Sequence, residues 1–246
     1  LSANEIANEL EGGIGLLESP LRDRPPRHRS LRAVFDASWR RLPERERTAL
    51  RNLATFHGGF RREAAREVAG VGLPLLLALV NRSFLRCGPA GRFTQHPLVW
   101  QYLQDRAAED AATADVQARH AAYFTEFLRE RESGLRGADA RRVRDEIRNE
   151  LANVRAAWAW AVDHGREDLL GGTADAMYVY HYDEGRYHEA EALFTAAAEA
   201  VRPGSLARGR MLVFLGGCYN ILASRDRAIE TLRAARVDRG TAYEVA

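Results

Sequence analysis

Lysine is absent from this chain of 246 residues, so all 36 of its basic residues are arginines. Alanine is abundant, and we attribute the bias to coding in a GC-rich genome rather than to a functional device. The 34 acidic residues leave a formal charge of only +2. So small a charge gives no support to a general nucleic-acid-binding role, although it is compatible with a local basic patch.

Cysteine is scarce, since only Cys87 and Cys218 occur and no C-x-x-C motif is present. This pattern argues against a disulfide framework or a cysteine zinc site and fits a reducing cytoplasm. Long apolar runs are also missing, because the longest, from Leu73 to Val80, is far too short to span a bilayer. With no signal-peptide pattern, the chain is predicted to be cytoplasmic and to have no membrane partner. It starts at Leu1 rather than methionine, which indicates a piece of a longer protein.

Motifs for catalysis and for nucleotide binding are absent too. The sequence has no G-x-x-x-x-G-K-[ST] loop, no G-x-S-x-G and no H-E-x-x-H. We therefore predict that the chain is not an enzyme and holds no cofactor by itself. His181, Asp183, Glu184 and His188 stand close together in the sequence, but a turn between two helices would scatter them. We predict polar loop residues there and no metal site.

What is present is ordinary for a soluble globular chain, with 46% hydrophobic and 28% charged residues. The length fits one large domain or two ordinary ones. Residues 1–29 are predicted to form a helix, over 1–18, and then an extended linker rich in proline and arginine. The linker arginines could bind an acidic partner or could simply be solvated.

Residues 30–107 are predicted to form a winged-helix domain. Ser30 is a good N-cap for a first helix, and Pro43 begins a second. Helices over 61–69 and 73–82 follow, and then a hairpin of strands at 83–86 and 92–95 around a Gly/Pro-rich turn. A last amphipathic helix starts at Pro97.

The remaining chain is predicted to be helical, with a connecting region at 108–170 that includes a long helix over 143–162. Residues 171–246 resemble an incomplete tetratricopeptide array. Ala190, Phe194 and Ala197 match Ala228, Leu232 and Ala235 at an offset of 38 residues. Gly216 stands where such a repeat needs a small residue at the close contact of its two helices, and Gly185 is the predicted turn residue.

Aromatic residues gather in the predicted repeats. Tyr178, Tyr182 and Tyr187, together with Tyr180, could line a groove for a peptide or could fill helix interfaces. We retain Tyr178, Tyr182 and Tyr187 as candidate partner-binding residues.

A winged helix first suggests DNA binding, for which the reading helix would be Leu73–Arg82. This helix is apolar nearly all round, and only Asn81 and Arg82 could reach base edges. It is therefore predicted to be buried on both sides, and direct DNA binding is disfavoured.

Several blocks in order resemble the winged-helix region of bacterial signal-transduction ATPases with numerous domains, in particular AfsR-like multidomain regulators. The blocks are Arg27–Ala33, Phe35–Trp39, Leu53–Phe60, Leu79–Leu85 and His96–Tyr102, with Glu150–Trp160 resembling the helix that joins the two parts. The resemblance covers about residues 20–235. It implies a winged helix that folds onto an NB-ARC-type ATPase core, which this chain lacks, followed by tetratricopeptide repeats.

The same resemblance implies a role for His96. In such proteins a histidine at the start of the last winged-helix helix contacts the ADP phosphate in the resting state. An imidazole beside a helix N-terminus is suited to that contact, and it is equally suited to capping the helix. The family motif is Met-His-Asp, whereas this chain has Gln95, His96 and Pro97, so any role of the aspartate is missing.

The sequence thus predicts a mainly α, non-catalytic regulatory fragment of a signal-transduction ATPase and transcriptional regulator. Its partners would be its own nucleotide-binding domain, with ADP or ATP bound there, and a protein or peptide effector at the repeats. One alternative is a stand-alone tetratricopeptide scaffold, which an upstream phosphate-binding loop would exclude. The other is a DNA-binding winged helix, for which mobility shifts would be the test.

Overall fold

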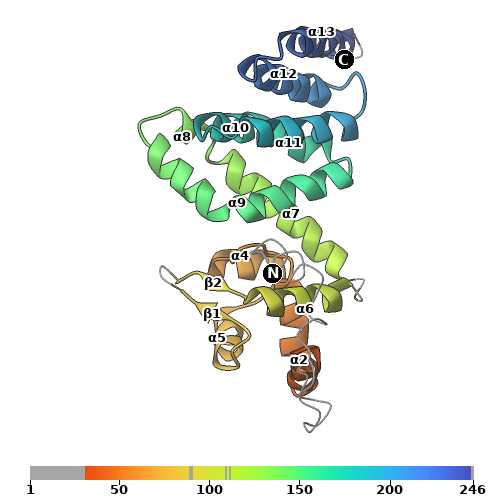
Figure 1. The fold of residues 1–246 in the computed structure, drawn as a ribbon. Coiled ribbons are helices and arrows are strands. Elements are labelled where there is room, and N and C mark those ends of the chain that lie inside the picture. The colour runs from red at the N-terminus through yellow and green to blue at the C-terminus, as the bar shows by residue number, and fades with distance from the viewer. Residues whose placement is uncertain (1–30, 89–90, 109, 111, 245–246) are drawn as a thin grey trace, which may run out of the picture. The chain divides into compact units, whose positions relative to one another are not determined.

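The computed structural model describes residues 31–88, 91–108, 110 and 112–244 (Figure 1). The predicted helix at 1–18, the linker at 19–29 and the Ser30 cap lie outside these residues. The described chain is mainly helical, with one small antiparallel sheet. It forms two compact units that divide between Arg119 and His120, within helix α7 (Thr113–Arg129).

The first unit contains α2 (Leu31–Arg40), α3 (Glu44–Leu53), α4 (Arg62–Ala69), α5 (Leu73–Asn81), β1 (Arg86–Cys87), β2 (Phe93–Thr94) and α6 (Pro97–Ala108). The predicted helices and hairpin all occur, with ends displaced by one to a few residues. Pro43 is the N-cap of α3, so this helix begins directly after the proline. Leu50, Leu53 and Phe56 are among the fully buried residues of this unit's core.

The sheet is small because its strands are short. Arg86 pairs with Thr94, and Cys87 pairs with Phe93. Phe93 also exchanges two backbone hydrogen bonds with Phe60, at 2.9 and 2.8 Å. Phe60, in the turn after α3, therefore forms an isolated antiparallel bridge to strand β2. The sequence pattern predicted the hairpin but not this bridge, which joins residues that lie far apart in the chain.

The second unit contains the rest of α7 and then α8 (Glu132–Leu135), α9 (Ala140–Asp163), α10 (Glu167–Asp183), α11 (Tyr187–Ala200), α12 (Leu206–Ile221) and α13 (Arg225–Glu244). Figure 1 shows α10 beside α11 and α12 beside α13, and helices α11 and α12 also pack on each other. The predicted helix at 143–162 is α9, which is longer at its N-terminus.

Helices α11 and α13 begin 38 residues apart, at Tyr187 and Arg225, which is the offset found in the sequence. The turns before them share a left-handed residue at the same offset, Gly185 and Ala223. Gly216 lies at the predicted close approach of α12 and α13, because a Cβ there would come 2.7 Å from Cγ of Leu232. The pairs α10–α11 and α12–α13 therefore place corresponding residues 38 positions apart in the sequence.

The predicted domain boundaries, after residues 29, 107 and 170, remain a prediction. The assignment of the winged-helix and tetratricopeptide folds also remains a prediction. Among the described residues, none of the helices combines the length and the apolar composition needed to cross a bilayer.

Candidate functional site

His96 lies at the first turn of α6, which starts at Pro97. Its carbonyl accepts the N–H of Trp100 at 2.9 Å, and its ring Nδ1 accepts the N–H of Leu98 at 3.3 Å. These are the two bonds of an N-cap residue. Because Nδ1 accepts, the neutral ring carries its proton on Nε2. The imidazole is exposed, so the ring both caps the helix and leaves an N–H donor at its positive end.

Gln95, the preceding residue, has a buried side-chain amide nitrogen with no hydrogen-bond partner among the described residues. An orphaned buried amide costs free energy. Because this nitrogen is enclosed, the exposed ring of His96 is the group that can meet an anionic oxygen from outside the chain.

The turn between α3 and α4 contacts strand β2, which ends two residues before His96. Gly59 has a φ of +97°, and a Cβ there would lie 2.7 Å from the carbonyl oxygen of Phe93, so only glycine fits. The guanidinium of Arg92 donates to the carbonyl oxygens of Gly58, at 3.3 Å, and Gly59, at 3.0 Å. The turn and strand β2 are thereby fixed to each other just before His96.

Two side chains of α6 fasten this helix to the end of α3. The indole N–H of Trp100 is shared between the carbonyls of Ala54, at 3.0 Å, and Phe56, at 2.9 Å. Gln104 donates to the Ala54 carbonyl as well, at 2.6 Å. The ring of His57 meets Trp100 edge-on at 5.2 Å, and burial lowers the pKa of this histidine. The carbonyls of the C-cap and of the turn directly after α3 are thus satisfied by α6 side chains.

A polar clamp joins α2 to the other end of α6. The Tyr102 hydroxyl donates to Asp36 at 2.8 Å, and the guanidinium of Arg106 donates to the same carboxylate at 2.6 Å. Burial and the bond to Asp36 raise the pKa of Tyr102 to about 12. Burial would raise the pKa of Asp36, but its bonds to Tyr102 and Arg106 outweigh burial and lower it. Asp36 is therefore charged at neutral pH.

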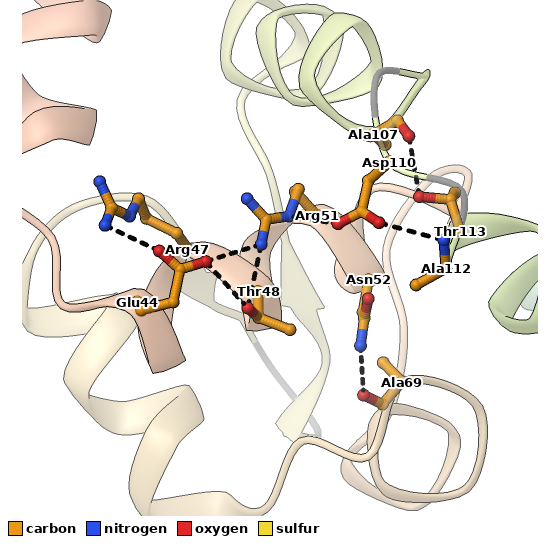
Figure 2. A network of polar contacts seen from close by, with 10 residues as sticks. All are labelled: Glu44, Arg47, Thr48, Arg51, Asn52, Ala69, Ala107, Asp110, Ala112 and Thr113. Carbon is orange, nitrogen blue, oxygen red and sulfur yellow. Dashed lines mark hydrogen bonds and ion pairs between the residues drawn. The ribbon is translucent and has the colours of Figure 1, made fainter.

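A second network links α3 to the connection between α6 and α7 (Figure 2). Arg51 lies in the middle, 2.8 Å from Glu44 and 3.1 Å from Asp110. Asp110 also accepts the backbone N–H of Ala112 at 3.0 Å, and the Thr113 hydroxyl donates to a carbonyl of α6 at 2.8 Å. These bonds hold the start of α7 against the first unit's core.

The prediction that the helix after residue 72 is buried on both sides was wrong. In α5, Leu76 and Leu79 are fully buried, whereas Leu73 is 38% and Leu77 48% exposed. Apolar composition alone did not show which face would be covered, since the hydrophobic pattern lacks a polar side. Of its polar C-terminal residues, Arg82 forms an ion pair with Glu46 at 2.7 Å.

The candidate tyrosines lie together in the second unit. Tyr178 stacks on Phe214 of α12 at 4.8 Å and is 6.0 Å from Tyr182, which meets Tyr187 edge-on at 5.8 Å. Tyr182 is 48% exposed, and Tyr178 and Tyr187 are half-buried. A Cβ on Gly217 would come 2.6 Å from the Tyr178 hydroxyl, so this glycine makes room for that ring. The cluster both packs three helices, α10, α11 and α12, and presents an aromatic surface.

The four polar residues near the α10–α11 turn have separate partners. His181 is fully buried beside Glu189, Asp183 pairs with Arg144, Glu184 pairs with Arg148, and exposed His188 is 3.7 Å from Glu191. Within the described part of the chain, no group of three or more such side chains could hold a metal ion.

Fold and site together define a mainly helical, two-unit chain with an exposed capping histidine. No family model and no solved structure matches it. In an alignment of 175 residues that covers 67% of its length, the chain is 32% identical to "Putative HTH-type transcriptional regulator Mb0914c" of Mycobacterium bovis and to "Putative HTH-type transcriptional regulator Rv0890c" of Mycobacterium tuberculosis. The match covers 20% of each, so the chain spans about a fifth of the length of the curated relatives it matches. These names relate it, at a coarse level, to transcriptional regulators.

Proposed function

We propose that this chain is the regulatory arm of a multidomain transcriptional regulator of the AfsR-like, signal-transduction ATPase class. Its first unit acts as a winged helix that restrains a nucleotide-binding core, and its second unit acts as a tetratricopeptide-like receiver of a protein or peptide effector. The relatives' names support the regulatory class. The ordered sequence blocks around His96 support the ATPase type.

The observation that carries the proposal is the bonding of His96. Nδ1 is occupied by the cap, and Nε2–H of the exposed ring is free to donate. A donor at a helix N-terminus suits a phosphate oxygen. An ADP phosphate on the neighbouring core would supply the acceptor, and His96 would hold the resting arrangement through it. Release of that contact would favour the open state.

The test uses the full-length protein with His96→Ala. Losing one hydrogen bond to a charged oxygen costs about 1.5–3 kcal/mol, so ADP release is expected to accelerate by roughly tenfold or more. His188→Ala is the matched control, because it removes an 85% exposed histidine from the second unit. Unchanged ADP release in His96→Ala would remove the sensor role. A coding sequence upstream of Leu1 without a phosphate-binding loop would remove the ATPase assignment and leave the scaffold.

The effector part of the proposal rests on the aromatic surface of Tyr178, Tyr182 and Tyr187. Exposed aromatic side chains held by packing are effective anchors for a peptide. Tyr182→Ala is expected to weaken effector-dependent activation at least tenfold, whereas Val237→Ala, at a 67% exposed site on α13, is not. Equal activation in both variants would move the effector site elsewhere.

Direct DNA reading by α5 is the competing function. Its exposed leucines offer nothing to base edges, and of the two residues named above for base contacts Arg82 is paired with Glu46, which leaves Asn81. Mobility shifts with this chain on mixed duplex at low salt are therefore expected to show no tight complex. A tight, sequence-selective shift would favour the DNA-binding function over the regulatory arm.

A further inference from the structure

A polar cavity of about 430 Å³ lies between the N-terminal half of α9 and the C-terminal end of α10. Its volume falls in the range of small-ligand sites. The lining consists of three arginines and three carboxylates: Arg141, Arg144, Asp145, Arg148, Asp183 and Glu184. The four that come from α9 follow the i, i+3, i+4, i+7 spacing of one helix face. Because every lining side chain is charged, the cavity suits a ligand that is polar throughout.

One arginine of the cavity is fully engaged within the chain. Nη2 of Arg148 lies 2.8 Å from both carboxylate oxygens of Glu184, and its Nε lies 3.3 Å from one of them. Its Nη1 pairs with Asp145. All three nitrogens of this guanidinium therefore have acceptors, and such charge-assisted bonds hold the side chains in place. Arg148 and Glu184 thus form a fixed wall, and a ligand must use the other four residues.

The other two arginines have donors to spare. Arg141 is exposed and forms no hydrogen bond or ion pair with the described residues. Arg144 gives Nη1 to Asp183 at 2.7 Å, which leaves its Nε and Nη2 without an acceptor among those residues. Three positions apart on α9, the two guanidinium groups lie on the same face. Their planar sets of donors match the two oxygens of a carboxylate, so this pair is suited to a ligand carboxylate.

Two carboxylates of the cavity keep an oxygen for a ligand. Asp183 uses Oδ2 for its bond to Arg144, and Asp145 uses Oδ1 for its bond to Arg148. No described residue donates to the second oxygen of either aspartate. Asp183 is also the last residue of α10, where the helix dipole is negative and favours a cation. These two oxygens are therefore suited to an ammonium group.

We propose that this cavity binds a small zwitterion, a free amino acid with a hydrophilic side chain. Its carboxylate lies at Arg141 and Arg144, and its ammonium group lies at Asp145 and Asp183. The three arginines and three carboxylates of the lining sum to zero charge, which a zwitterion leaves balanced. Because the ligand contacts both α9 and α10, it stabilises their packing. The site goes beyond the proposed regulatory function and requires neither the nucleotide-binding core nor the tyrosine cluster.

Isothermal titration calorimetry of the chain with L-serine, L-glutamine and L-glutamate tests this proposal. At least one of these amino acids is expected to bind saturably. Its N-acetyl derivative lacks the ammonium group and its α-amide lacks the carboxylate, so each derivative should bind roughly tenfold more weakly or worse. Absence of saturable binding by all three amino acids would overturn the proposal, and so would binding of either derivative as tightly as the parent amino acid.

Arg141→Gln is the first variant, because it breaks no contact among the described residues. It should weaken amino-acid binding by roughly tenfold or more. Arg225→Gln is the matched control, since it removes another exposed guanidinium of the second unit that has no partner among those residues and does not line the cavity. Wild-type affinity in Arg141→Gln, or an equal loss in both variants, would contradict the assigned carboxylate contact.

Asp183→Asn distinguishes the zwitterion site from a plain anion site. It removes a carboxylate that holds the ammonium group and releases Arg144 at the same time. Amino-acid binding should weaken by roughly tenfold or more, whereas inorganic phosphate should bind this variant more tightly than wild type. A general loss of structure would weaken the binding of both probes. Phosphate that binds wild type more tightly than every amino acid tested would assign the cavity to anions and overturn the proposal.

Discussion

His181 is a fully buried imidazole whose Nδ1 lies 2.8 Å from the carbonyl oxygen of Met177 and whose Nε2 is 3.3 Å from Glu189. Burial lowers its pKa and outweighs the attraction of that carboxylate. The ring is therefore neutral in the folded chain, and unfolding lets it bind a proton near its ordinary pKa of 6.5. Its stabilisation is complete above that pH and is lost as the pH falls toward the lowered, folded-state pKa.

We expect the urea midpoint to decrease as the pH is lowered from about 7.5 to about 5.5. The free energy of unfolding should decrease by up to about 1.4 kcal/mol per pH unit for each proton gained on unfolding. His181→Gln should reduce this pH dependence. His188→Gln, at an 85% exposed position, should leave it unchanged. The same dependence in wild type and His181→Gln would show that other groups, such as His57, cause it.

Gly59 offers a second prediction at a single residue, because two separate costs act there. Gly59→Ala meets both a left-handed φ and a collision with the Phe93 carbonyl. Gly70→Ala is the matched control, since Gly70 has a φ of +69° but open space around it. We expect about 1–2 kcal/mol of destabilisation for Gly70→Ala and several kcal/mol for Gly59→Ala. Equal losses in denaturant unfolding would mean that the backbone conformation alone matters.

At the scale of elements, the clamp between α2 and α6 should be energetically coupled. A double-mutant cycle of Tyr102→Phe and Asp36→Asn is expected to give about 1–2 kcal/mol of interaction free energy, since Tyr102 is buried. The exposed ion pair of Arg32 and Asp105, which joins the same two helices, is the control and should give about 0–0.5 kcal/mol. A clamp coupling as small as the control's would mean that packing alone joins α2 to α6.

The elements also show what the sequence could and could not predict. Helices and hairpin followed from periodicity, Pro43, Pro97 and the Gly/Pro turn, because these signals are local. The role of Trp100 as a donor to the turn after α3 was not predictable, since its acceptors lie more than forty residues earlier. The exposure of Leu77 was missed for the same reason: which apolar face is covered depends on distant elements.

Helix α9 carries a further copy of the residue pattern shared by α11 and α13, and this copy was missed although its signal is in the sequence. Val154, Trp158 and Ala161 precede their α11 counterparts by 36 residues rather than 38, so a search at a fixed offset passes over them. Of the candidate site residues, the capping bond of His96 follows from its place before Pro97. The unsatisfied amide of Gln95 depends on burial, which the local pattern does not determine.

For the whole molecule, the decisive property is that each unit has its own core. Leu53 is fully buried in the first unit and Phe194 in the second. Calorimetry is expected to show two transitions. Leu53→Ala should lower one of them, at a cost of about 2–5 kcal/mol, and Phe194→Ala should lower the other, at about 3–5 kcal/mol.

Hydrogen exchange assigns each transition, since amides of α3 and α11 report on different units. Substitution in one unit should leave exchange in the other unit's core unchanged. A single transition that both substitutions lower equally would mean that the units unfold as one. Independent transitions would instead give each unit its own stability, as expected if one restrains a neighbouring domain while the other receives the signal that releases it.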